Sequence, residues 1–165
     1  MLPAGQKIRA VSVSAAPSGP GSPFTKNNQS WDLACARARQ ESILVLDCTQ
    51  HQGLVSTAFY YADSPEDISR VTPGQPSNPG RSCLKDHIYV PNSLRTQAEE
   101  YMAGQYSYQY TGQGGLSWSI PYATGVLALG WQLQPQLSMD QIWNLLIASS
   151  ATINGCNVID RVEHL

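Results

Sequence analysis

The segment 114–121, with the sequence GGLSWSIP, places a serine where the backbone itself favours negative charge. Two glycines precede Ser117 closely, and the small and apolar residues after it predict a helix from about Ser117 to Gln132. The first N–H groups of a helix have no partner within it and lie at the positive end of its dipole. A nucleophilic serine there would attack a carbonyl beside these groups. The plain alternative is a serine that only caps the helix.

Cysteines and histidines form a second set with the composition of a zinc site. Cys48 is followed closely by His51, and Cys83 is followed closely by His87. Two thiolates and two imidazoles are the ligand set of many structural zinc sites. Because the two pairs come from distant segments, a zinc-binding module is an alternative and not the main interpretation. A nucleophilic Cys–His pair is a weaker alternative, since the sequence places no orienting Asn or Asp for it.

Three tyrosines alternate along the sequence QYSYQYTG, just before the serine segment. Tyr106, Tyr108 and Tyr110 would lie on one face of a strand, because side chains alternate between the two faces. They line a cleft ahead of Ser117 in one interpretation and form the exposed face of a hairpin in the other. We favour the second, with residues 95–115 as a polar surface loop or hairpin.

The elements that must position these residues alternate between strand and helix patterns. One buried strand is predicted over 8–14 and a second over 42–50, whose unbroken apolar run is typical of a strand covered on both faces. Residues 28–40 between them have a helical pattern. The inward face of this helix is expected to carry Trp31, Ala34, Cys35 and Ala38. A strand–helix–strand unit predicts a parallel sheet with a right-handed crossover.

The later segments are predicted from turn and capping signals. Residues 63–82 contain four prolines and two glycines, which indicates an irregular excursion within the domain. A strand is predicted over 87–93. A last helix is expected to begin at Ser138, where Gln141 completes a capping box, and to pack through Ile142, Leu145 and Leu146. Residues 154–165 are expected to form a turn and a short tail.

Residues 115–129, GLSWSIPYATGVLAL, resemble the serine motif of the subtilisin-like serine peptidases, or subtilases. In that motif the nucleophilic serine follows Gly-Thr and precedes a proline and a helix of small residues. Gly115, Ser117 and Pro121 match, whereas Leu116 stands where the family usually has threonine. The resemblance implies that Ser117 is the nucleophile of peptide-bond hydrolysis through an acyl-enzyme, with Gly115 beside the substrate.

Upstream segments resemble other parts of the same family fold. The first strand, VSVSAAPSG, resembles the family strand that flanks the substrate, which would place Ser14, Ala15 and Ala16 along the cleft. The second strand resembles the one that leads to the oxyanion-stabilising asparagine. Either Gln50 or His51 occupies that position here, so the resemblance implies one of them as the oxyanion donor.

The aspartate and histidine motifs that precede the serine in subtilases have no match in this sequence. We therefore expect an α/β fold, a parallel sheet flanked by helices, subtilisin-like but incomplete. Residues 1–165 would form one partial catalytic domain, its C-terminal portion. Because a serine without a base is a weak nucleophile, we expect the isolated chain to be inactive. The alternative is a pseudoenzyme or a regulatory or assembly half.

Composition limits the classes of partner. The net charge is −2 and only 13% of residues are charged, so neither nucleic acid nor a membrane is expected as a partner. The expected partners are a peptide or protein substrate and a missing or separately encoded N-terminal half. No cofactor or metal ligand is predicted from the residues, although the family resemblance leaves room for calcium. Four scattered cysteines and no signal-peptide pattern predict reduced thiols and a cytoplasmic protein.

Overall fold

The computed structural model describes residues 7–19, 22–24, 26–49, 54–60, 67–75, 78–79 and 83–159. Its helices are α1 (Asn28–Gln40), α2 (Leu116–Leu133) and α3 (Met139–Ala148), with the short 3₁₀ helix η1 (Ile68–Arg70). Its strands are β1 (Ala10–Val13), β2 (Leu44–Asp47), β3 (Val55–Phe59), β4 (Thr72–Gln75), β5 (Asn78–Pro79), β6 (Ile88–Pro91), β7 (Arg95–Met102), β8 (Gln105–Thr111), β9 (Ala151–Ile153) and β10 (Cys156–Val158).

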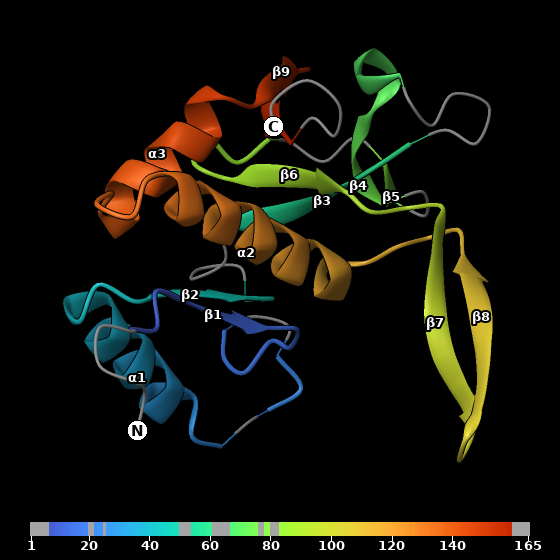
Figure 1. The fold of residues 1–165 in the computed structure, drawn as a ribbon, viewed down its shortest axis with the longest axis horizontal. Helices are drawn as coiled ribbons and strands as arrows, with labels where there is room; N and C mark the ends of the chain where they lie inside the picture. Colours follow the sequence, from blue (N-terminus) through green and yellow to red (C-terminus); the bar gives the residue numbers. More distant parts are fainter. Residues whose placement is uncertain are drawn as a thin grey trace.

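The strands form three groups, and the architecture is mixed α/β. β1 and β2 make a parallel pair, while a larger sheet has the order β5-β4-β3-β6-β10-β9. The neighbours β3–β6 and β6–β10 are parallel, and the pairs toward both edges of this sheet are antiparallel. β7 and β8 form a separate hairpin that projects from the body (Figure 1). The parallel strands were predicted, but the antiparallel flanks were not.

Helix α2 is the element around which both strand groups pack. It contacts β1 and β2 as well as β3 and β6, and it crosses the molecule between them (Figure 1). Its inner face carries Ile120, Ala123 and Leu127, which are fully buried. Burying a large apolar side chain stabilises a fold by about 1.5–3 kcal/mol. This face is therefore the main packing surface of the core.

Strand β1 lies beside α2, and the residues that flank it reach toward both ends of the helix. At one end Arg9 donates hydrogen bonds to the carbonyl oxygens of Pro135 and Leu137, and its guanidinium lies 5.6 Å from the Trp131 ring centre. At the other end Ser14, which follows β1, contacts Ser117 near the start of α2. The strand and the helix therefore run in opposite directions, side by side.

Several local predictions are confirmed. The helix predicted over 28–40 is α1, and the one predicted from Ser117 is α2, which begins at Leu116. Both hydrogen bonds of the capping box at Ser138 and Gln141 are present at the start of α3. Residues 95–115 contain the β7–β8 hairpin, as favoured.

The inward faces of α1 and α3 were predicted less well. Ala34 is exposed, and α1 has no fully buried residue, because it packs mainly on β2 of a two-stranded pair. Leu145 was assigned to the apolar stripe of α3 but is 47% exposed, whereas Ile142 and Leu146 are buried. Trp143 is also buried, so the packed face of α3 is rotated from the predicted one.

The prediction of an irregular segment over 63–82 is wrong for much of its described part. This part contains η1, β4 and β5, and β4 pairs with β3. Proline is tolerated in β5 because this strand lies at the sheet edge, where a missing N–H costs no ladder bond.

Besides β4 and β5, three strands of the larger sheet were not predicted: β3, β9 and β10. The turn expected in the segment 154–165 is present at residues 154–155, but the residues after it form β10, which pairs with β6, and not a tail. Within the described part of the chain, no helix combines the length and apolarity needed to cross a membrane.

Candidate functional site

Ser117 lies in the first turn of α2, and its side chain is exposed. Its hydroxyl donates to the carbonyl oxygen of Ser14 at 3.4 Å, and the Ser14 hydroxyl donates to the carbonyl oxygen of Ser117 at 2.7 Å. Its hydroxyl also hydrogen-bonds with the Cys48 side chain. Ser14 and Cys48 directly follow β1 and β2, so the serine lies at the carboxyl ends of parallel strands, where α/β folds commonly bind ligands.

Pro121 explains the contact between Ser14 and the carbonyl of Ser117. This proline lies inside α2, four residues after Ser117. A proline there has no N–H to donate to the carbonyl four residues before it. The freed Ser117 carbonyl accepts the Ser14 hydroxyl instead. The proline thus couples the end of β1 to the start of α2.

Asn92, directly after β6, fixes the start of α2 from the other side. Its side-chain N–H₂ donates to the Gly115 carbonyl at 2.7 Å and to the Ser119 hydroxyl, and its side-chain oxygen accepts from the Gly115 N–H at 3.2 Å. Both Asn92 and Ser119 are buried. Gly114 has φ +68°, and a Cβ there would lie 2.4 Å from the Asn92 carbonyl oxygen. Only glycine fits at this close approach.

The electrostatics around Ser117 come from the helix terminus. Among the described residues, the N–H groups of Leu116 and Ser117 have no acceptor, as expected at the first turn of a helix. The whole of α2 contains no Asp, Glu, Lys or Arg. These free donors can stabilise an oxyanion that forms next to the Ser117 hydroxyl.

Of the predicted cleft residues, Ser14 contacts Ser117, and Ala15 and Ala16 follow it in the chain. The Ala15 N–H donates to the Val13 carbonyl at 2.8 Å, and the Ala15 carbonyl accepts from the Cys48 N–H at 2.8 Å. Its backbone is therefore already paired within the chain. Gly115 is buried as the N-cap of α2 and sets the position of the serine.

The predicted oxyanion donors Gln50 and His51 lie outside the described residues. The last described residue before them, Thr49, is buried and donates hydrogen bonds from its N–H and hydroxyl to the Asp47 side chain. Asp47 also accepts from the Trp31 indole N–H at 2.9 Å. The end of β2 is thus held firmly, and residues 50 and 51 continue from it.

The surroundings of Cys48 disfavour its thiolate form. Burial raises the pKa of its thiol, the hydrogen bond from Ser117 lowers it, and the nearby Asp47 raises it again, so that the net shift is upward. Burial together with Asp47 and Asp32 likewise raises the pKa of Cys35 to about 11. Since the thiolate is the nucleophilic form, the pKa of Cys48 argues against it as a nucleophile in place of Ser117.

The zinc and Cys–His alternatives are wrong where they depend on Cys83. Cys83 forms a disulfide with Cys156, which also overturns the expectation of four reduced thiols. His87 precedes β6, at the opposite strand end from Ser117, and its Nδ1 lies 2.9 Å from the Ser56 hydroxyl. The sequence could not predict this because the two bonded cysteines are 73 residues apart.

The three alternating tyrosines form an exposed face. Tyr106, Tyr108 and Tyr110 are 82%, 81% and 63% exposed on β8. On the neighbouring strand, Gln97 accepts a hydrogen bond from the Trp118 indole N–H, which ties the hairpin to α2. Of the two interpretations of these tyrosines, the structure therefore confirms the exposed hairpin face and not the tyrosine-lined cleft.

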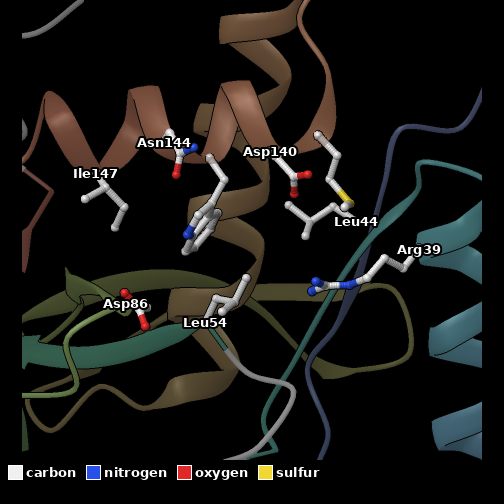
Figure 2. A pocket seen from close by; sticks show the side chains of 9 residues that line it. Arg39, Leu44, Leu54, Asp86, Asp140, Asn144 and Ile147 are labelled. Atoms are coloured by element: carbon white, nitrogen blue, oxygen red, sulfur yellow. The ribbon is translucent and has the colours of Figure 1, made fainter.

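A separate hollow lies at the opposite end of the strands. It has a volume of about 280 Å³ and is bounded by Leu54 and Asp86 on one side and by Asp140, Asn144 and Ile147 of α3 on the other (Figure 2). Leu54 and Asp86 precede β3 and β6, whereas Ser117 lies near the residues that follow strands. The hollow is therefore not part of the serine site.

No family model matches this sequence, and no curated protein matches it. Among solved structures, Sphericase, a subtilase, superposes on 93% of this chain with a TM-score of 0.60 and 14% sequence identity. The chain is similar to Sphericase in fold. It spans 57% of the length of Sphericase, and at this identity the likeness concerns the fold alone.

Asn92 is the positioning residue that the sequence analysis missed. Its signal is a polar side chain directly after the apolar run of β6, at the strand end that faces the serine.

Proposed function

We propose that this chain carries the nucleophile of a serine peptidase of the subtilase kind, with Ser117 as the attacking residue. One observation carries the proposal: an exposed serine hydroxyl in the first turn of α2, beside two N–H groups that have no acceptor among the described residues. The likeness of the fold to Sphericase supports it. The substrate would be a peptide or protein.

In the proposed reaction, the Ser117 hydroxyl attacks the carbonyl carbon of a peptide bond and gives up its proton to a base. The N–H groups of Leu116 and Ser117 would stabilise the resulting oxyanion. The C–N bond then breaks to leave an acyl group on Ser117, and water releases it. Asn92 and Ser14 would act as positioning residues, because they hold the two sides of the helix start.

The base must come from outside the described residues. His87 is the imidazole that they contain, and it lies at the other end of the strands, paired with Ser56. A histidine and aspartate from polypeptide outside residues 1–165, as in the missing-half hypothesis, would complete the site. His51 is the other candidate, since it follows the strand end next to Ser117.

A nonenzymatic role is the second candidate. The Ser117 hydroxyl is engaged with the Ser14 carbonyl and Cys48, as it would be in a pseudoenzyme whose serine only joins two elements. In that case Ser117 would not react with electrophiles even when a base is supplied.

Labelling with a fluorophosphonate separates these functions. We expect slow labelling of the 165-residue chain and faster labelling when imidazole is added as an external base, with the phosphonate on Ser117 in peptide mass spectrometry. Ser117→Ala should abolish the labelling, whereas Ser107→Ala, at an exposed serine of the hairpin, should leave it unchanged. Labelling at another residue, or none at any imidazole concentration, would contradict the proposal.

A further inference from the structure

Trp143 of α3 differs from the other three tryptophans of the chain in its indole N–H. Each of the other three indole N–H groups donates a hydrogen bond within the chain. That of Trp143 has no acceptor among the described residues, although the side chain is only 9% exposed. A side-chain donor buried to this extent normally has a partner. Trp143 lines the hollow between the strand ends and α3, so a ligand in the hollow can supply the acceptor.

Charged side chains at the rim of the same hollow are also unpaired. Asp86, Asp140 and Arg39 form no ion pair and no side-chain hydrogen bond among the described residues. Figure 2 shows Asp86 at one end of the hollow, and Asp140 and Arg39 toward the other. All three are exposed. Their carboxylate and guanidinium groups are therefore free to meet a ligand.

The wall of the hollow between these charges is apolar. Leu44 is buried there, and Leu54 and Ile147 are half-buried. The volume of about 280 Å³ lies at the small end of the range for ligand pockets, which begins at about 300 Å³. A pocket of this kind, with an apolar wall and a few polar groups that converge on it, is typical of small-molecule sites. The occupant should therefore be a small molecule and not a segment of a folded partner.

We propose that this hollow binds a free basic α-amino acid, of the lysine or arginine type. Two carboxylates and one guanidinium leave one negative charge in excess, which matches a ligand with two cationic groups and one carboxylate. Asp86 and Asp140 each accept from one cationic group of the ligand. Arg39 and the Trp143 indole N–H are the donors for its carboxylate. The apolar stem of its side chain lies against Leu54 and the Trp143 ring.

Simpler ligands leave part of this set without a partner. A diamine satisfies both carboxylates, but it gives Arg39 and the Trp143 N–H no acceptor. An apolar amino acid supplies that acceptor and occupies only one of the two carboxylates. The site is separate from Ser117, so the proposal holds whether or not Ser117 is a nucleophile.

Calorimetric titration of the 165-residue chain tests the proposal with four ligands. L-lysine and L-arginine should each bind with a stoichiometry of one. Norleucine lacks the second cationic group of lysine, and cadaverine lacks its carboxylate. Each of these two should bind about tenfold or more weakly than lysine, because each loses a charge-assisted hydrogen bond.

Variants locate the binding in this hollow. Asp86→Asn and Arg39→Gln should each weaken lysine binding about tenfold or more. Trp143→Phe keeps an aromatic ring and removes the N–H, and should weaken binding by about threefold to tenfold. The matched control is Glu99→Gln, which removes one negative charge at an exposed position of β7 and should leave the affinity unchanged. Circular dichroism checks that each variant folds.

The ligand series on the unmodified chain keeps the proposal testable if a variant does not fold. No binding of lysine or arginine at millimolar concentration would overturn it, as would equal affinity for lysine, norleucine and cadaverine. Lysine binding that survives unchanged in folded Asp86→Asn, Arg39→Gln or Trp143→Phe would also overturn it. An equal loss in Glu99→Gln would show attraction to the net charge of the chain, and would contradict a built site.

Discussion

Strands β6 and β1 both pack against α2, yet they differ in how completely they are enclosed. All four residues of β6 are buried, and β6 has a hydrogen-bonded strand on each side. In β1 no residue is fully buried, and one edge has no partner among the described residues. The fold is therefore closed on the β6 side and open on the β1 side. Ser117 lies between them, with Asn92 from one side and Ser14 from the other.

The largest expected effect is a loss of stability on the closed side, the side of β6. The disulfide between Cys83 and Cys156 links the segment before β6 to β10 across 73 residues. Closing a loop of that length in the unfolded chain contributes about 4 kcal/mol to stability. The double variant Cys83→Ala/Cys156→Ala should lower the free energy of unfolding in urea by that amount. Cys35→Ala, on α1 of the open side, should change it little. Equal losses in the free energy of unfolding for the two variants would contradict the difference between the closed β6 side and the open β1 side.

The next effect compares the two faces of α2. Leu127 is 1% exposed, so Leu127→Ala leaves a cavity in the core and should lower the free energy of unfolding by about 3 kcal/mol. Leu129 is 45% exposed, and Leu129→Ala should cost less than about 0.5 kcal/mol in a dilute monomer. Chemical denaturation at low protein concentration measures both. A large cost for Leu129→Ala in the monomer would show that the outer face is already covered within the chain.

The smallest expected effect is a pH dependence on the closed side. Burial lowers the pKa of His87, although the nearby Asp86 opposes this shift. The unfolded chain, with an ordinary histidine pKa of about 6.5, then binds more protons than the folded chain below that pH. The free energy of unfolding should fall as the pH drops from about 6.5 through the lower folded pKa. His87→Gln should remove this part of the dependence. An unchanged slope in the variant would show that His87 does not titrate as inferred.

Local signals predicted α1, α2 and the capped start of α3, because periodicity and capping residues lie within one element. The same reasoning failed for β10, whose place beside β6 depends on a contact between distant segments. It also failed for the Cys83–Cys156 bond, since spacing alone does not show which cysteines meet. Leu145 fits the helical pattern of α3, but no element covers its side of the helix.

For the candidate site, the sequence indicated Ser117 and the helix that follows it, and the structure adds what holds them. Pro121 leaves the Ser117 carbonyl without a donor in the helix. The hydrogen bond from the Ser14 hydroxyl to this carbonyl requires β1 to lie beside α2. The hydrogen bonds between Asn92 and Gly115 require β6 to end beside the start of α2. Both are tertiary relations that no spacing in the sequence reveals. The roles assigned to Gln50 and His51 stay predictions.

The central proposal is that this chain carries the nucleophile of a peptidase site whose base lies outside the described residues. Its most direct test is the rate of peptide hydrolysis by the purified 165-residue chain, compared with Ser117→Ala. We predict no hydrolysis above the level of the variant, because no described base lies at Ser117. Robust cleavage that disappears in Ser117→Ala would contradict the account and would mean that this chain supplies its own base, with His51 as the first residue to substitute.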